Sequence, residues 1–207
     1  MARPRLVLLD FDGVLASYSH AVRFAHLARS ARCSVERVRR ALMDEGLEAR
    51  YDAGLLSTGE YLHQLGDALG APIDAATWCA ARRASTHVDP DTEACVSALA
   101  GRVAVAVAVG ILSNNGLLMG EVIRALVPSW FPQLDGAVLL SGVLGARKPE
   151  TAAFQRALAH FGVGAADTLF VDDSATHVAA AAGLGLDARQ AEEPAALQRI
   201  LSDAGLA

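Results

Sequence analysis

The chain contains few cysteines. There are three in 207 residues, Cys33, Cys79 and Cys95, and no two of them form a C-x-x-C pair. An odd number of widely spaced cysteines disfavours a disulfide framework and a structural zinc site. We therefore expect reduced thiols and a functional site built from other side chains.

Long hydrophobic runs are also missing. The longest candidate, Val103 to Leu112, is too short to cross a bilayer, which takes about 20 apolar residues. Near the first residue, the apolar run Leu6 to Leu9 is shorter than the hydrophobic region of a signal peptide. These features predict a cytoplasmic protein that does not bind a membrane.

Positive charge is in short supply. The chain has 18 Lys and Arg against 23 Asp and Glu, which gives a net charge of -5 at pH 7. This balance does not favour binding to nucleic acid or to an anionic surface. With 53% hydrophobic and 20% charged residues, the composition is that of a globular protein of one domain, or of one domain that carries an insertion.

Two aspartates stand at the end of the first apolar run, in the segment LVLLDFDGVLA. Such a run is typical of a strand buried on both faces of a parallel sheet, and parallel sheets carry their chemistry at the carboxyl ends of the strands. Asp10 and Asp12 are two residues apart, so their side chains point to the same side of an extended chain. The alternative is an ordinary Asp and Gly turn after a strand.

The same theme of an apolar run ending in polar residues returns further along the chain. We expect strands within 103–112, 135–141 and 167–173, and helices within 116–127, 151–161 and 175–182. Alternating strands and helices predict an α/β fold, with a doubly wound, Rossmann-like parallel sheet as its core.

One stretch, from Ser17 to His87, shows amphipathic helical patterns and no strand-like run. It includes a capping box formed by Ser57 and Glu60. We expect a helical cap over residues 17–87, inserted into an α/β core made of residues 1–16 and 88–207. Such an insertion can act as a lid, although a structural helical hairpin outside the site is the alternative.

The other expected strands also end in residues suited to phosphate chemistry. Ser113 and Asn114 precede a helix, whose N-terminus favours an anion. Lys148 precedes another helix, and Asp172 and Asp173 end the last of these strands. Each has an ordinary explanation as a cap or a solvated charge, but the four clusters together favour one site.

The order LLDFDGVLA, ILSNN, RKPE and FVDDSATHVAAAAGLG resembles the haloacid dehalogenase (HAD) superfamily of hydrolases, in the subfamily with a helical cap between the first two motifs. The resemblance implies that Asp10 is the nucleophile and Asp12 the general acid and base. It also implies that Ser113 and Asn114 bind the phosphoryl group and that Lys148 offsets its charge.

The resemblance further implies a Mg²⁺ cofactor. Its expected ligands are Asp10, Asp12, Asp172 and Asp173, with Asp173 the more direct ligand of the acidic pair. His177 stands where family members often carry Asn, and we assign it no catalytic role.

We therefore predict a Mg²⁺-dependent phosphatase for a small phosphorylated metabolite, with an aspartyl-phosphate intermediate. A phosphoglucomutase-like transfer on a sugar phosphate is the nearest alternative, and a binding module without activity is another. Tyr18, His20 and Arg23 are candidates to line the substrate cavity, or else form an exposed face of the first cap helix. The sequence does not predict the substrate or the oligomeric state.

Overall fold

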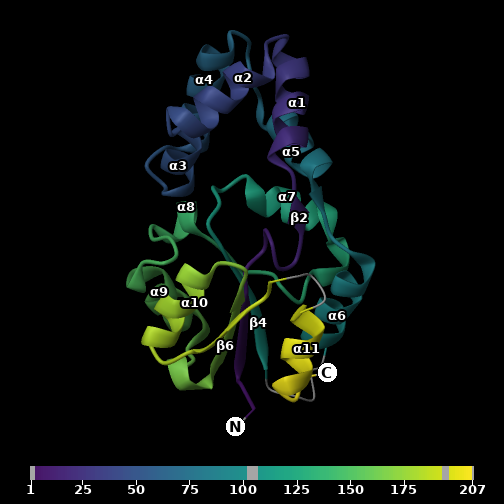
Figure 1. The fold of residues 1–207 in the computed structure, drawn as a ribbon, viewed down its shortest axis with the longest axis vertical. Helices are drawn as coiled ribbons and strands as arrows, with labels where there is room; N and C mark the ends of the chain where they lie inside the picture. The colour runs from purple at the N-terminus through teal and green to yellow at the C-terminus, as the bar shows by residue number, and fades with distance from the viewer. Residues whose placement is uncertain (1–2, 102–106, 193–195, 207) are drawn as a thin grey trace.

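A five-stranded parallel sheet forms the centre of the fold in the computed structural model, which describes residues 3–101, 107–192 and 196–206. The strand order is β5-β4-β1-β6-β7 (Figure 1). The strands are β1 (Leu6–Leu9), β4 (Ala108–Ser113), β5 (Val138–Leu140), β6 (Thr168–Asp172) and β7 (Asp187–Gln190). The predicted α/β, Rossmann-like core is confirmed.

Helices cover both faces of the sheet. Successive side chains of β1 point to opposite faces, so Leu6 and Leu8 pack with Phe154 of α9, whereas Val7 and Leu9 join the cluster on the other face. The helices of the first face are α9 (Thr151–Phe161) and α10 (Ala175–Gly183). Those of the second face are α6 (Pro90–Ala100), α7 (Met119–Leu126) and α11 (Ala196–Asp203). All four side chains of β1 are fully buried, which explains its unbroken apolar run.

Short elements complete this part of the chain. They are η2 (Pro128–Trp130), α8 (Ser141–Leu144) and η3 (Ala165–Asp167). The three cysteines form no disulfide within the described residues, and each is half-buried. None of the helices in the described part of the chain combines the length and apolarity needed to span a membrane.

A helical insertion leaves the sheet after β1 and returns before α6. It is framed by a two-stranded antiparallel ribbon of β2 (Ser17–Tyr18) and β3 (Thr86–His87). Its helices are α1 (His20–Ala31), α2 (Val35–Arg39), the π-helix η1 (Arg40–Asp44), α3 (Leu47–Asp52), α4 (Thr58–Leu69) and α5 (Ala75–Ser85). Figure 1 shows these helices above the carboxyl end of the sheet. We call residues 17–87, with this ribbon at their two ends, the helical insertion.

The predicted elements differ from the observed ones in a few places. The stretch Ser17 to His87 was expected to contain no strand, which is wrong at its two ends, where β2 and β3 pair. The expected strand within 103–112 appears as β4 from Ala108 onward, and residues 103–106 lie outside the described residues. Helix α6 and strand β7 were not predicted. The predicted capping box is present. The N–H of Glu60 donates to the hydroxyl of Ser57, and the N–H of Ser57 donates to the carboxylate of Glu60.

The helical insertion also contacts the core at a second place, which we call the seam. The backbone N–H of Gly116 donates to Asp52 Oδ1 (2.8 Å), and the N–H of Leu118 donates to the hydroxyl of Tyr51 (3.0 Å). The hydroxyl of Ser141 donates to the carbonyl of Asp52. A Cβ on Gly116 would overlap the Tyr51 ring, so the close approach requires glycine there. The insertion is thus attached to the core at both the ribbon and the seam.

Candidate active site

A buried lysine joins two carboxylates from neighbouring strands. Lys148 Nζ lies 2.8 Å from Asp10 Oδ1 and 2.6 Å from Asp172 Oδ2. The sheet holds the two aspartates in place, because Asp172 ends β6 and the N–H of Asp10 donates to the carbonyl of Val171 in that strand. All three charged side chains are buried. The predicted convergence of Asp10, Lys148 and Asp172 therefore occurs.

Burial sets the charge balance of this group. It raises the pKa of Asp10 from 3.8 to about 6, because the attraction of Lys148 only partly offsets desolvation and Asp172 adds repulsion. Burial also opposes the charge on Lys148, but Asp10 and Asp172 hold its pKa above the ordinary value. One ammonium thus compensates two buried carboxylates incompletely, and the cluster favours a further cation.

Three carboxylates are close enough to bind that cation. Asp10, Asp172 and Asp173 each offer an oxygen, and these atoms lie within 4.8 Å of one another. A set of carboxylate oxygens suits a hard divalent cation such as Mg²⁺. Asp172 is fully buried, and its Oδ1 already accepts from the N–H of Ser174, whereas Asp173 is exposed. Asp173 therefore has more freedom to bind an ion directly.

His177 lies beside this cluster. Its Nδ1 is 3.0 Å from Asp172 Oδ1, so the ring supports the buried carboxylate. Burial raises the pKa of Asp172, but the contacts with His177 and Lys148 outweigh this effect and hold the pKa below its usual value. His177 is thus in direct contact with the acidic pair.

Gly13 makes room for the acidic pair. Its φ of +98° is one that other residues rarely adopt. A Cβ at this position would also collide with the carboxylate of Asp173. The glycine after the two aspartates therefore allows both the turn that carries Asp12 and the position of Asp173.

Asp12 points to a different set of partners. Its Oδ2 accepts from Arg82 Nη2 (2.9 Å) of helix α5 and from Asn115 Nδ2 (3.0 Å). Its carboxylate is not part of the group of three described above, although Asp12 was expected among the metal ligands. The contact with Arg82 brings the helical insertion directly onto the expected acid and base.

The two neighbouring asparagines have different environments. Asn115 Nδ2 donates to the hydroxyl of Ser113 (2.9 Å) as well as to Asp12. The amide of Asn114 instead holds the main chain of Lys148, donating to its carbonyl (2.8 Å) and accepting from its N–H (2.9 Å). The side chain predicted to bind phosphate thus positions the Lys148 loop, and Asn115 was missed.

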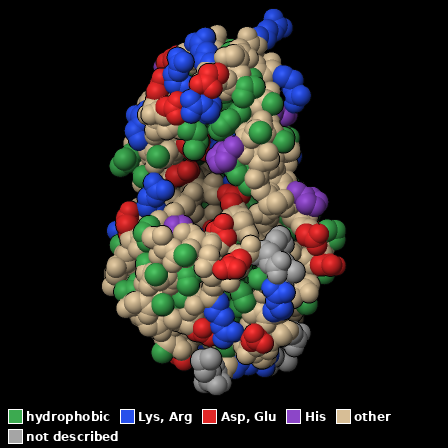
Figure 2. Space-filling model, viewed as in Figure 1, with side chains coloured by type: hydrophobic (Ala, Val, Ile, Leu, Met, Phe, Trp, Pro, Cys, Tyr) green, Lys and Arg blue, Asp and Glu red, His purple; other side chains and the backbone are tan. Residues whose placement is uncertain are grey.

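A cavity of about 340 Å³ lies between Asp12 and the helical insertion. In Figure 2 a hollow with acidic side chains around it separates the upper and lower parts of the molecule. Tyr18, His20 and Arg23, the three candidates from the sequence, all line this cavity. Burial, with help from Arg23 and Arg82, lowers the pKa of His20 and favours its neutral ring.

The cavity is bounded on the insertion side by a polar network, which we call the roof network: Arg23, Glu48, Tyr61 and Trp78. Arg23 Nη1 lies 2.7 Å from Glu48 Oε1. The hydroxyl of Tyr61 donates to Glu48 Oε2 (2.6 Å) and accepts from Trp78 Nε1 (2.9 Å). Although burial opposes its charge, Arg23 and Tyr61 hold the pKa of Glu48 below the usual value. The network fixes the shape of this wall.

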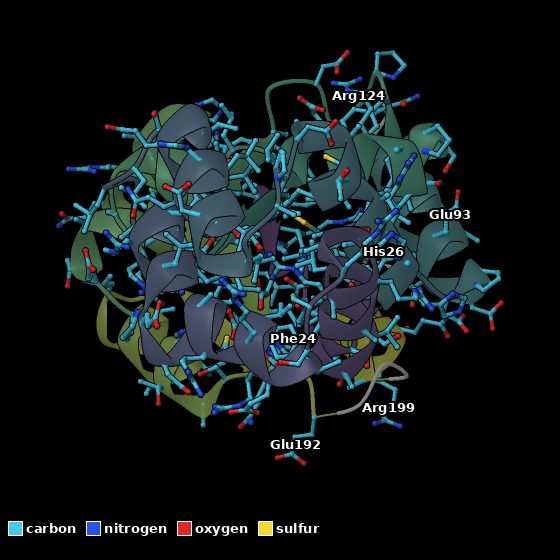
Figure 3. All side chains as sticks on the ribbon, turned by 90° about the horizontal axis from the view of Figure 1, so that it is seen from above. Phe24, His26, Glu93, Arg124, Glu192 and Arg199 are labelled. Carbon is cyan, nitrogen blue, oxygen red and sulfur yellow. The ribbon has the colours of Figure 1, made fainter. Side chains whose placement is uncertain are left out.

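Some exposed charged side chains lie away from this centre. Seen from above, the labelled side chains of Arg124 and Glu192 lie at the periphery of the molecule (Figure 3). The buried charges of the described residues therefore gather where the helical insertion faces the strand ends.

Comparison with known proteins gives one family and one fold. Residues 4–185 match a family model described as haloacid dehalogenase-like hydrolase. No curated protein matches the chain. A HAD-like hydrolase from Porphyromonas gingivalis has a similar structure, with a TM-score of 0.76, 22% identity and coverage of 97% of this chain and 98% of that one.

Two other solved structures carry ligands. A HAD family enzyme from Bacteroides thetaiotaomicron, in complex with magnesium and inorganic phosphate, has a TM-score of 0.73, 17% identity and coverage of 89% and 92%. An L-2-haloacid dehalogenase from Xanthobacter autotrophicus, with chloropropionic acid covalently bound, has a TM-score of 0.62, 20% identity and coverage of 99% and 84%. At these identities the likeness shows the fold alone.

Proposed function

Because the chain belongs to the family of haloacid dehalogenase-like hydrolases, we propose that it is a Mg²⁺-dependent phosphatase of a small phosphorylated metabolite. The observation that carries the proposal is the cluster of Asp10, Asp172 and Asp173 around the buried ammonium of Lys148. A solved relative of the same fold binds magnesium and inorganic phosphate together.

Asp10 is the nucleophile in this proposal. A carboxylate oxygen attacks phosphorus, the bond from phosphorus to the leaving oxygen breaks, and an aspartyl-phosphate forms. The attack brings two anions together, which is costly in a buried site unless cations lie close by. Lys148, 2.8 Å from Asp10, supplies one positive charge. When bound by Asp10, Asp172 and Asp173, Mg²⁺ supplies further charge stabilisation.

Asp12 moves the proton. It protonates the leaving alkoxide and then takes a proton from the water that hydrolyses the aspartyl-phosphate. Its carboxylate borders the cavity and is held by Arg82 and Asn115, which orients it toward the leaving group. The hydroxyl of Ser113, next to Asn115, holds a phosphoryl oxygen.

The helical insertion serves as a cap in this proposal, with 17–87 as its limits and 1–16 and 88–207 as the catalytic core. It excludes water from the site and selects the leaving group. Tyr18 and His20 contribute to that selection because they line the cavity outside the cluster of carboxylates. Arg23 does so through the roof network.

Dehalogenation is the competing reaction on this fold, since one structural relative is an L-2-haloacid dehalogenase. A halide leaves without needing a proton, whereas an alkoxide needs one. The presence of Asp12 at the cavity, two residues after the nucleophile, therefore favours phosphate esters.

The test measures phosphate release from p-nitrophenyl phosphate and from a panel of phosphorylated sugars and acids, with Mg²⁺ and after chelation. We expect Mg²⁺-dependent hydrolysis, and Asp10→Asn should abolish it without changing the circular dichroism spectrum. Acid-quenched wild-type enzyme should carry one phosphoryl group on the peptide that contains Asp10.

Activity of Asp10→Asn within about tenfold of wild type would contradict the proposal. Halide release from 2-chloropropionate without any phosphatase activity would favour the dehalogenase, and isomerisation of a sugar phosphate would favour a mutase.

A further inference from the structure

The cavity above Asp12 holds guanidinium groups that the protein itself does not saturate. Three arginines line it: Arg23, Arg82 and Arg147. The first two have carboxylate partners, since Arg23 pairs with Glu48 and Arg82 pairs with Asp12. The three arginines differ in how many of their donors remain free.

Arg147 is the least satisfied of them. It is half-buried, and its side chain has no hydrogen bond or ion pair with any residue in 3–101, 107–192 or 196–206. It precedes Lys148, whose ammonium is used by Asp10 and Asp172. Lys148 thus binds the carboxylates of the active site, whereas the preceding Arg147 faces the cavity.

Arg82 has one free end. Its Nη2 reaches Asp12, and its Nε reaches the sulfur of Met119 (3.3 Å). Its Nη1 has no hydrogen-bond partner in the described part of the chain. The guanidinium carbon lies 4.1 Å from the centre of the Tyr18 ring, which keeps the group in place.

The other titratable groups of the lining do not remove this excess of positive charge. Burial, together with Glu48, raises the pKa of Asp52 to about 8 despite Arg23 and Arg82. His20 favours its neutral form, as described above. The side chains that line the cavity therefore carry more positive than negative charge, and an anionic group of a bound molecule would balance it.

We propose that the leaving group of the substrate carries a carboxylate, which binds Arg147 and the free Nη1 of Arg82 beside Asp12. This inference rests on the proposed phosphatase function and names its substrate class: small phosphorylated hydroxy acids. A carboxylate matches the planar donor fork of arginine, and a cavity of about 340 Å³ suits a small molecule.

The experiment compares two three-carbon substrates that differ mainly in one group. 3-Phosphoglycerate has a carboxylate where glycerol 3-phosphate has a hydroxymethyl group. We expect wild type to prefer 3-phosphoglycerate by about tenfold to a hundredfold in kcat/KM, the usual range for a charge-assisted hydrogen bond. Arg147→Met should remove most of this preference by lowering kcat/KM for 3-phosphoglycerate far more than for glycerol 3-phosphate.

Arg83→Met is the matched control, because Arg83 follows Arg82 on α5 but is exposed. It should leave both activities unchanged. Equal use of the two substrates by wild type, or an equal loss on both in Arg147→Met, would overturn the proposal. A preference for propane-1,3-diol bisphosphate over 3-phosphoglycerate would overturn the assignment of a carboxylate.

A second measurement does not depend on turnover. Glycerate should protect Arg147 from modification by phenylglyoxal, as mapped by peptide mass spectrometry, and glycerol should not. Protection in a chain that hydrolyses no phosphate ester would refute the phosphatase and keep the carboxylate site. Hydrolysis without preference or protection would keep the phosphatase and refute the carboxylate site.

Discussion

The two sides of the cavity compensate buried charge in different ways. On the floor, by which we mean Asp10, Asp12, Ser113, Lys148, Asp172 and Asp173, one ammonium serves two buried carboxylates and leaves negative charge over. In the roof network, Arg23 and Glu48 form a pair completed by two aromatic hydrogen-bond donors. The floor therefore favours a cation, whereas the charges of the roof network are paired with each other, although the buried Nε of Arg23 has no hydrogen-bond partner in the described part of the chain.

This difference reflects two roles, because the floor holds the reacting groups and the roof network defines the shape of the cavity. A site that performs a reaction keeps unbalanced charge where the reacting groups bind, even though that costs stability. A wall that only defines a cavity pairs its buried charges with each other, as Arg23 and Glu48 do. Substitutions on the two sides should accordingly differ in whether they change activity or stability.

After the loss of activity expected for Asp10→Asn, the largest effect on the floor is expected at Asp12. Asp12→Ala should lower kcat by about a hundredfold to ten-thousandfold, the usual contribution of a general acid and base. Alkyl phosphates should lose more than p-nitrophenyl phosphate, whose leaving group needs little protonation. Steady-state rates on both ester types check this, and equal losses on the two would argue against the acid role.

The two acidic residues after β6 should separate by their burial. Asp173→Ala should raise the Mg²⁺ concentration for half-maximal activity more than Asp172→Ala, because Asp173 is exposed and free to bind the ion. Asp172→Ala should instead lower the melting temperature more, since it leaves buried Lys148 with one partner. Mg²⁺ titrations and thermal unfolding measure the two effects. Ca²⁺ should not replace Mg²⁺, and a reversed order would exchange the roles.

A break in the roof network should cost stability. Arg23→Met leaves Glu48, whose side chain is 15% exposed, without its charged partner, so the free energy of unfolding should fall by about 3 kcal/mol, the lower end of the range for a buried pair. Adding Glu48→Leu should recover part of this loss because the unpaired charge is then gone. The matched control is Arg39→Met, which breaks an exposed pair with Glu36 and should change stability little. Urea unfolding measures the free energy of unfolding of each variant. Equal losses of this free energy for Arg23→Met and Arg39→Met would contradict a buried network.

A pH-dependent effect is expected at Asp52, where the two sides meet at the seam. Burial and Glu48 raise its pKa from 3.8 to about 8, against Arg23, Arg82 and the N–H of Gly116. Since the folded pKa is raised, its contribution to stability is fully present below about pH 4 and is lost as pH rises to about 8. Wild type should therefore lose stability relative to Asp52→Asn over this range. Parallel stability curves for the two proteins would contradict the shift.

The floor could be predicted because strand ends carry it. In a parallel sheet the carboxyl ends of neighbouring strands meet at one edge, so Asp10, Ser113 and Asp172 are brought together by topology alone. The amphipathic patterns likewise gave the helices of the insertion. Local signals of this kind do not depend on how distant helices are rotated.

The partners of the floor could not be predicted in the same way. Arg82 and Arg83 are neighbours in one helix, yet Arg82 is buried on Asp12 and Arg83 is exposed. Asn114 and Asn115 likewise point to Lys148 and to Asp12. Which of two adjacent residues faces the site depends on the rotation of a helix or the path of a loop, and both are set by tertiary packing.

The seam attaches the helical insertion to the core in addition to the β2–β3 ribbon and to the contacts of Arg82 with Asp12 and Met119. Any swing about the β2–β3 ribbon has to release Asp52 from Gly116 and Tyr51 from Leu118. Because these hydrogen bonds end on backbone N–H groups, sequence change on the core side cannot easily remove them. Opening of the cavity is thus coupled to these two hydrogen bonds at the seam. Gly116→Ala, whose Cβ would displace the Tyr51 ring, should therefore change access to the cavity without altering a reacting group.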